Sequence, residues 1–299
     1  MKISLLSILH RSLTGQHSPT ATQLCAREVA TRFIGLSHLR INVEEAISFI
    51  RSICPDSILE SPVEHVVIAN LGDNPRHLDT LKLPKSYGFK GGAARELLCD
   101  RLGLRDFRAP RDLDLVRRGA FYIQQDESVA REFMPHDYRH GARVELIRSM
   151  ARYLSSRDLT INELCALYEA TNVSLLGALD TAGNVIRPSR YRGGSIHRQP
   201  SLEGKIFLKM VRLFAEAEHF GDASRVVGIP DAVIFSEVDL AINLDKAFQR
   251  EGGVARRFID ALVHLGALEA SDDPLARVLE ELEHLRHGEL TLLPHAPPL

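Results

Sequence analysis

Two adjacent glycines, Gly91 and Gly92, join a short strand-like run to a segment of strong helix formers. Ser86–Lys90 favours a strand and Ala93–Leu102 favours a helix, so the chain must turn sharply between them. A helix that starts on glycines exposes backbone N–H groups that no Cβ covers, and such groups suit phosphate. This junction therefore predicts both a mixed fold and an anion-binding turn.

Further segments with strand-like patterns lie on both sides of the glycine pair. His65–Ala69 is short and β-branched, and Arg111–Arg117 alternates polar and apolar residues, as a strand with one buried face does. Ala120–Gln124 and Arg143–Ile147 have similar patterns, with a helix predicted between them at Asp126–Phe133. The middle of the chain is therefore expected to form a small mixed β-sheet with helices, which is an α+β fold.

Both ends of the chain have a helical pattern. Within residues 1–60, Thr20–Leu36 and Asn42–Ile53 carry apolar residues three and four positions apart, and the pattern is again helical from Lys205 onward. We predict three parts: a helical N-terminal extension over residues 1–80, a mixed-sheet domain over residues 81–200 and a helical C-terminal region over residues 201–299.

The composition excludes several classes of protein. With 299 residues, 44% of them hydrophobic and 25% charged, the chain can bury a core and is not a disordered chain. Its four cysteines form no C-x-x-C pair, which predicts free thiols in a reducing compartment. No run approaches the ~18 apolar residues of a membrane span, and Met1–Leu9 lacks a signal-peptide cleavage site. We therefore expect a cytoplasmic protein with no membrane partner.

The charge is unevenly distributed along the chain. The 37 basic and 39 acidic side chains nearly cancel, so the net charge of -2 indicates no particular partner. Residues 187–212, however, contain seven Lys and Arg residues and only one carboxylate, Glu203. Such a basic stretch permits contact with the phosphates of a nucleic acid.

Asp112 and Asp114 form a D-x-D pair on the strand predicted at Arg111–Arg117. Because side chains alternate along a strand, the two carboxylates share one face while Leu113 and Leu115 face the core. Two close carboxylates repel each other unless a cation lies between them, and oxygen ligands favour Mg²⁺. A solvated strand face is the alternative interpretation. A phosphate-binding turn combined with a metal-binding pair favours nucleotidyl transfer.

Glu145 is a candidate for a third catalytic carboxylate. It lies on the strand predicted at Arg143–Ile147, where Val144 and Leu146 face one side and Glu145 the other. The alternative is an ordinary exposed strand carboxylate.

Four segments resemble, in order, the head domain of the tRNA nucleotidyltransferase and poly(A) polymerase family. Gly91–Leu98 resembles the G-G-x-V-R-D-x-L-L opening of that family, and Asp112–Asp114 matches its D-x-D. Arg157–Leu164 is similar to R-R-D-F-T-I-N-A-L, and Leu208–Ala215 to the helix L-R-A-V-R-F-A-A. The resemblance implies a polymerase-β-like nucleotidyltransferase head domain.

This resemblance, which covers about residues 86–220, implies metal and phosphate ligands. Asp112 and Asp114 would bind Mg²⁺ or Mn²⁺, while Gly91, Gly92 and Arg95 would contact the triphosphate of an NTP. An Arg side chain presents a planar fork of donors to phosphate, which agrees with that role.

The resemblance also implies nucleotide contacts from the segment after the sheet. Arg157 would reach the phosphates, Asp158 would accept hydrogen bonds from the ribose hydroxyls, and Asn162 would orient this loop or contact the nucleotide. Without the family match, Arg157 and Asp158 would be read as a surface pair that caps a helix at Thr160–Leu167.

The sequence departs from the family at several positions. Ser156 replaces the first Arg of R-R-D, which removes one phosphate contact. The CCA-adding branch selects bases with the Asp and Arg of E-D-x-x-R, where this chain has Glu203 and Ile206. Glu203 would stand in for the Asp, but Ile206 cannot replace an Arg. Glu203, Lys209 and Arg212 are the candidate nucleotide-binding residues of this region.

We expect a metal-dependent nucleotidyltransferase that moves a nucleoside monophosphate from an NTP to an acceptor hydroxyl and releases pyrophosphate. The family implies an RNA acceptor, a tRNA-like 3′ end. One alternative keeps the chemistry on a protein or small molecule, as in a toxin or modifying enzyme. Another is an inactive nucleotide- or RNA-binding module, which the intact Asp112 and Asp114 argue against. The N-terminal extension is a candidate surface for a protein partner.

Overall fold

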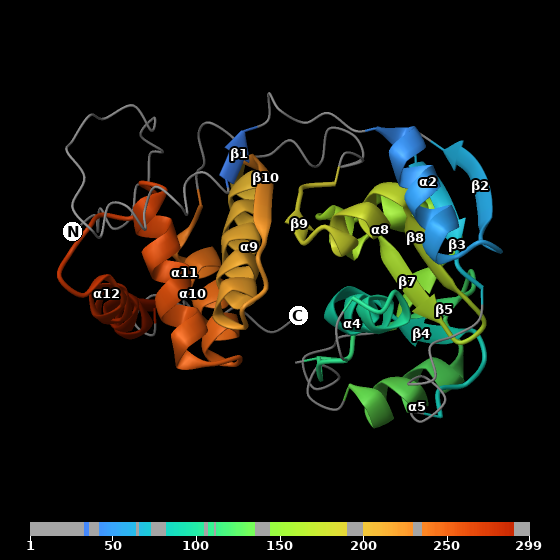
Figure 1. Ribbon diagram of the computed structural model, residues 1–299. Coiled ribbons are helices and arrows are strands. Elements are labelled where there is room, and N and C mark those ends of the chain that lie inside the picture. The colour runs from blue at the N-terminus through green and yellow to red at the C-terminus, as the bar shows by residue number, and fades with distance from the viewer. Residues whose placement is uncertain are drawn as a thin grey trace. The chain divides into compact units, whose positions relative to one another are not determined.

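A computed structural model of the protein describes residues 33–35, 42–63, 66–72, 82–104, 107–110, 112–134, 144–189, 200–229 and 235–289 (Figure 1). The side chains of residues 33–35, 61–63, 66, 200–203 and 284–289 are outside this description. The chain divides into two compact units: residues 38–197, and residues 1–37 together with residues 198–299.

The unit of residues 38–197 is built on a seven-stranded mixed sheet. Its strands in spatial order are β2 (Ile58–Val63), β3 (Val66–Asn70), β8 (Thr171–Ser174), β7 (Leu164–Leu167), β4 (Tyr87–Phe89), β5 (Leu115–Arg118) and β6 (Glu145–Ile147). All neighbours are antiparallel except β5 and β6, which are parallel with Val116 opposite Glu145. The predicted α+β class is confirmed.

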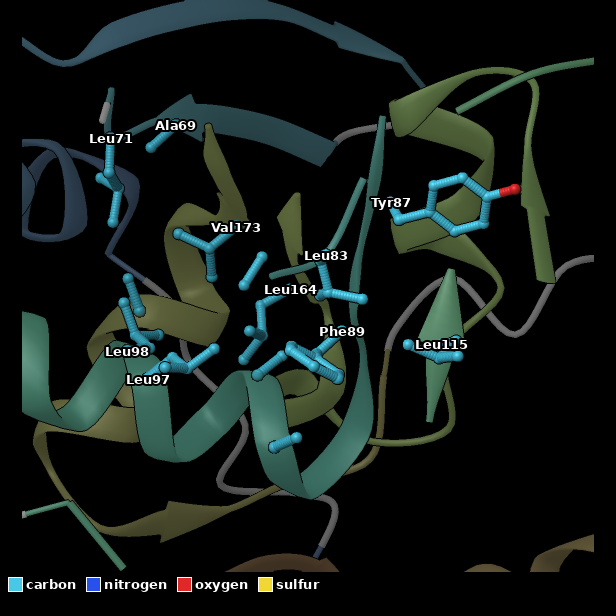
Figure 2. Packing of buried hydrophobic residues seen from close by; sticks show 14 of the residues in the cluster. Ala69, Leu71, Leu83, Tyr87, Phe89, Leu97, Leu98, Leu115, Leu164 and Val173 are labelled. Atoms are coloured by element: carbon cyan, nitrogen blue, oxygen red, sulfur yellow. The ribbon is translucent and has the colours of Figure 1, made fainter. Parts of the chain in front are cut away.

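Two hydrophobic clusters cover the two faces of this sheet. Leu115 belongs to one cluster and its neighbour Val116 to the other, as expected for successive residues of a strand. Figure 2 shows Phe89 of β4 and Leu97 of α4 in the larger cluster. The described helices of this unit are α2 (Val43–Ile53), α4 (Gly91–Arg101), α5 (Gln124–Phe133), α7 (Met150–Ser155) and α8 (Leu175–Ala182), with a 3₁₀ helix at Thr160–Asn162.

Gly88 lets β4 fit between its neighbours in the sheet. A Cβ built on Gly88 would lie 2.0 Å from the carbonyl oxygen of Ala166 on β7. No side chain fits there, so glycine is required by the close approach of the two backbones. The strand that leads into α4 is thereby held between β7 and β5, in the interior of the sheet.

The second unit consists mainly of helices. α9 (Pro200–His219) packs against α10 (Glu237–Phe248) and α11 (Gly252–His264), and α11 also contacts α12 (Pro274–Glu289). A short strand, β1 (Phe33–Gly35), pairs in parallel with β10 (Arg225–Ile229). Within the described parts of both units, no helix combines the length and apolarity that a membrane span requires.

The structure confirms some predicted elements. The helices predicted at Asn42–Ile53, Ala93–Leu102 and Asp126–Phe133 are present as α2, α4 and α5. Val66–Asn70 matches the predicted strand closely. The three-part division at residues 80 and 200 stays a prediction.

Other predicted elements are wrong. Phe33–Gly35 and Ile58–Val63 are strands inside the region predicted as helical, because β10 and β3 offer them backbone partners. Residues 20–32 of the predicted helix lie outside the described residues. The predicted strand at Ala120–Gln124 is a bend that leads into α5. The alternative interpretation of Arg157 and Asp158 placed a helix at Thr160–Leu167, where the structure has a short 3₁₀ helix followed by a strand at Leu164–Leu167.

A buried ion pair fixes α5 to the sheet. Asp126 of α5 accepts hydrogen bonds from Arg117 Nε at 2.5 Å, Arg117 Nη2 at 2.9 Å and the Tyr87 hydroxyl at 2.7 Å. Its second oxygen also accepts from the backbone N–H of Ile123 at 2.8 Å. Burial alone would raise the pKa of Asp126, but the hydrogen bonds from Arg117 and Tyr87 outweigh it and lower the pKa.

Replacing one partner of this pair should destabilise the fold strongly. We expect Arg117→Met to lower the free energy of unfolding by about 3–5 kcal/mol, because it leaves the buried Asp126 carboxylate without its cation. Urea denaturation measures the loss. The control is Glu127→Gln, whose exposed pair with Arg131 spans 3.7 Å and should contribute at most about 1 kcal/mol. Equal losses in both variants would contradict the prediction.

Candidate functional site

The start of α4 lies directly against the segment that enters β5. Gly91 has a positive φ of 61°, and a Cβ built on it would lie 3.0 Å from Asp114 Oδ2. The backbone N–H of Lys90 donates to the carbonyl oxygen of Asp114 at 2.9 Å. Gly92 has no atom within 4 Å of the position of a Cβ. The predicted phosphate turn and one predicted metal ligand are therefore in contact.

Asp112 and Asp114 precede β5 rather than lying within it. β5 begins at Leu115, so the predicted strand at Arg111–Arg117 starts later than the sequence pattern suggested. Leu113 and Leu115 both pack in the larger hydrophobic cluster, as predicted, and both aspartates are partly exposed. The apolar residues thus hold the D-x-D segment beside the turn at Gly91.

The donor set at this position is a pair of carboxylates. Among the described residues, no group of three or more His, Cys, Asp or Glu side chains is arranged to hold a metal ion. Mg²⁺ in proteins commonly takes one or two carboxylates and completes its octahedron with water and substrate phosphates. Asp112 and Asp114 fit that pattern in chemistry.

Glu145 forms ion pairs with two basic side chains, Lys90 and Arg157. Lys90 Nζ lies 2.6 Å from Glu145 Oε2, while Arg157 donates from Nη2 to Oε1 at 2.7 Å and from Nη1 to Oε2 at 3.3 Å. Burial would raise the pKa of Glu145, but the hydrogen bonds from Arg157 and Lys90 lower it. The catalytic role of Glu145 stays a prediction; the structure places it in a bridge between two basic residues.

Arg157 is held firmly at the end of α7. Its Nε donates to the Tyr153 carbonyl at 3.1 Å and its Nη2 to Ser156 Oγ at 2.9 Å. Its guanidinium carbon lies 4.2 Å from the centre of the Tyr153 ring, a cation–π contact. Together with Glu145, these contacts fix the orientation of the guanidinium.

Asp158 and Asn162 are in direct contact. Asn162 Nδ2 donates to Asp158 Oδ1 at 3.0 Å, and the same oxygen accepts from the backbone N–H of Leu159 at 2.9 Å. Asn162 therefore orients the Asp158 carboxylate, and its predicted role in the site stays a prediction. Contact of either residue with a nucleotide stays a prediction.

The segment that carries these residues is fastened to residues 187–189. The backbone N–H of Ser189 donates to the Asp158 carbonyl at 2.8 Å, and that of Thr160 donates to the Arg187 carbonyl at 3.0 Å. Arg187 in turn forms an ion pair of 2.9 Å with the buried Asp180. The segment is thus held by backbone hydrogen bonds at Asp158 and at Thr160, which suits a preorganised site.

Arg95 lies one turn after Gly91 on α4. Residues four apart share a face of a helix, so Arg95 projects on the same face as the glycine turn. Its side chain is partly exposed. Its predicted contact with phosphate stays a prediction.

Glu203, Lys209 and Arg212 lie on α9, in the other unit. The side chain of Glu203 is outside the described residues. Arg212 is buried, and it donates to Asn243 Oδ1 at 3.2 Å and to Glu216 Oε2 at 3.4 Å. Arg212 thus connects α9 to α10, and the nucleotide roles of all three residues stay predictions.

Two residues near the site were not singled out in the sequence analysis. Lys90 had a signal, since it is a cation directly before the glycine pair. Glu163 had none, because its importance depends on burial. It is fully buried and accepts hydrogen bonds from the hydroxyls of Ser174 and Ser189. Burial raises the pKa of Glu163 to about 7, although the two hydroxyls act in the opposite direction.

Glu163 should make stability depend on pH. Its folded-state pKa of about 7 exceeds the ordinary 4.5, so its contribution is fully present below about pH 4.5 and is lost as pH rises through 7. We expect the stability of Glu163→Gln relative to wild type to increase by up to about 3 kcal/mol from pH 4.5 to pH 8. Urea denaturation across this range measures it. Glu60→Gln, at an exposed site, is the control; parallel curves for Glu163→Gln and wild type would contradict the prediction.

Comparison with known proteins gives only distant similarity. No family model matches the sequence, and no curated protein matches it. The Thermotoga maritima CCA-adding enzyme complexed with tRNA is 18% identical, with a TM-score of 0.30, over 75% of this chain and 52% of that one. A CCA-adding enzyme in complex with ATP is 19% identical, with a TM-score of 0.31, over 73% and 50%.

The chain spans about half the length of these two enzymes. TM-scores near 0.3 are too low to assign a fold or an activity to this chain from them.

Proposed function

We propose that this protein is a metal-dependent nucleotidyltransferase, which transfers a nucleoside monophosphate from an NTP to an acceptor hydroxyl and releases pyrophosphate. The observation that carries the proposal is the contact between the turn at Gly91 and the carboxylate of Asp114. The start of a helix can bind phosphate and a pair of carboxylates can bind a divalent cation. Their contact therefore suits a ligand that carries phosphates and a divalent cation side by side.

The phosphates of the NTP would lie at the start of α4. The first N–H groups of a helix have no partner within the helix, and no side chain caps this end of α4. The first turn of α4 also contains no acidic residue that would repel an anion. Arg95 and Arg157 would add charge-assisted hydrogen bonds to the phosphate oxygens.

Asp112 and Asp114 would hold Mg²⁺ or Mn²⁺ beside the phosphates. When bound, the ion would neutralise developing charge and favour the deprotonated acceptor hydroxyl. Asp158, oriented by Asn162, would accept hydrogen bonds from the ribose hydroxyls.

For the acceptor we propose the 3′ end of an RNA, tRNA-like in shape. This step rests on the family that the motifs resemble and on the basic stretch at residues 187–212. Within that stretch, Arg187 and Arg212 have partners inside the protein. Lys205 also has a partner, because its Nζ lies 3.6 Å from Asp239 Oδ1.

Transfer should require both aspartates of the D-x-D segment. We expect Asp112→Asn and Asp114→Asn each to lower the rate of label transfer by several orders of magnitude with the fold unchanged, because each removes charge that would hold the metal. The assay uses purified protein, Mg²⁺, total RNA and each labelled NTP in turn. Asp56→Asn, in an exposed turn, is the control.

The same assay identifies the acceptor. Label on RNA supports the proposal as stated, whereas label on protein or a small molecule keeps the chemistry and corrects the acceptor. Transfer at the wild-type rate by the doubly substituted variant would contradict the metal site. Absence of transfer from every NTP, under conditions where wild type is folded, would contradict the enzyme assignment.

Selection of the base should be looser than strict C-C-A addition. Ile206 is buried on α9, so it offers no hydrogen bond to a base edge. Glu203 provides only acceptors, which favour bases with an exocyclic amine, so C and A should be preferred over U and G. Competition among the four NTPs on one RNA tests this in wild type and in Glu203→Ala. Strict C, C, then A, unaffected by Glu203→Ala, would show that the base is selected elsewhere.

A further inference from the structure

We propose that Lys90 is a binding residue for the triphosphate, and that Glu145 acts as a positioning residue that holds Lys90 and Arg157 at the site. Neither role follows from the sequence analysis, in which the glycine motif begins at Gly91 and strand alternation made Glu145 a candidate catalytic carboxylate. This inference rests on the proposed function, because it names a further contact of the same site with its NTP.

The location of Lys90 is the first support. It is the residue before the glycine turn, and its backbone N–H is hydrogen-bonded to the carbonyl of Asp114. Its ammonium reaches Glu145 on β6, two strands away from β4 in the sheet. The Lys90 side chain therefore extends across the edge of the sheet where Asp114 enters β5.

The charge of the cluster is the second support. Lys90 and Arg157 carry two positive charges against the single negative charge of Glu145. Lys90 Nζ and Arg157 Nη1 contact the same oxygen, Glu145 Oε2, at 2.6 Å and 3.3 Å. The two positively charged groups therefore lie close together. Without Lys90 the remaining pair would be neutral. Lys90 is thus the residue that makes this cluster attractive to an anion.

The state of each side chain shows how the cluster can act. Arg157 is largely buried, and besides Glu145 three further groups hold it: the Tyr153 carbonyl, the Ser156 hydroxyl and the Tyr153 ring. Within the described part of the chain, the Lys90 ammonium is bound by Glu145 alone, and a quarter of the Lys90 side chain is exposed. A flexible four-carbon stem with three rotatable donors can keep one hydrogen bond to Glu145 and give another to phosphate. Glu145 would then act through Lys90 and Arg157.

The test compares the affinities of ATP and AMP in the presence of Mg²⁺, by calorimetry without acceptor. Lys90→Met keeps the length of the side chain and removes its charge. We expect it to weaken ATP binding by about ten- to a hundredfold and to leave AMP binding nearly unchanged. Lys90→Arg should keep most of the preference for ATP over AMP. Lys85→Met, at an exposed lysine of the same unit, should match wild type.

Glu145 is tested through its coupling to Lys90. Glu145→Gln should reduce the ratio of ATP to AMP affinity in wild type, and should reduce it by less in the Lys90→Met background, because only the contact of Glu145 with Arg157 is then left to lose. A loss in the Lys90→Met background as large as in wild type would show that Glu145 acts independently of Lys90. That result overturns the role of Glu145 in positioning Lys90.

The outcomes separate this inference from the function on which it rests. If wild type prefers ATP and Lys90→Met keeps that preference, the role of Lys90 is wrong while the proposed function stands. If wild type binds no NTP, both are wrong. A Lys90→Met variant that still binds AMP as wild type does has kept its fold, so a loss of ATP binding there is a loss of phosphate contact.

Discussion

The close approach of β4 and β7 is the constraint on which the arrangement of the site depends. Gly88 lies so near the Ala166 carbonyl that any side chain would force the two strands apart. β4 leads into the turn at Gly91 and pairs with β5, while β7 follows the segment that carries Asp158 and Asn162. Separating β4 from β7 would therefore separate the proposed phosphate turn from the proposed ribose contacts.

The candidate site also brings acidic and basic side chains close together. Asp112 and Asp114 supply negative charge at the start of β5, and Lys90, Arg157 and Arg95 supply positive charge around the turn. Glu145 keeps two like charges together that would otherwise repel each other. Such an arrangement fits a ligand that brings phosphates and a divalent cation together, because each partner then meets charge of the opposite sign.

The acidic residues that support the site follow no periodic sequence pattern, and only their burial identifies them. Glu163 and Asp180 are acidic residues in the interior, each satisfied by neighbouring hydroxyl or guanidinium groups. They fasten the segment after α7 to Ser189 and Arg187. Glu163 lowers the stability of the fold at neutral pH. Burial raises its pKa to about 7, so its carboxyl group is partly ionised there while it is shielded from water.

The sequence alone determined the α+β class, the helices α2, α4 and α5, and the two leucines that place the D-x-D segment, because periodicity and turn residues act locally. Through a motif, it also singled out Asp158 and Asn162 as candidate site residues. Only the tertiary structure decided that Ile58–Val63 is a strand, that Lys90 meets Glu145, and that Arg212 is buried. These features depend on partners that are far away in the sequence. The local sequence pattern does not show which strand will pair with a segment, or which carboxylate from another strand will contact a side chain.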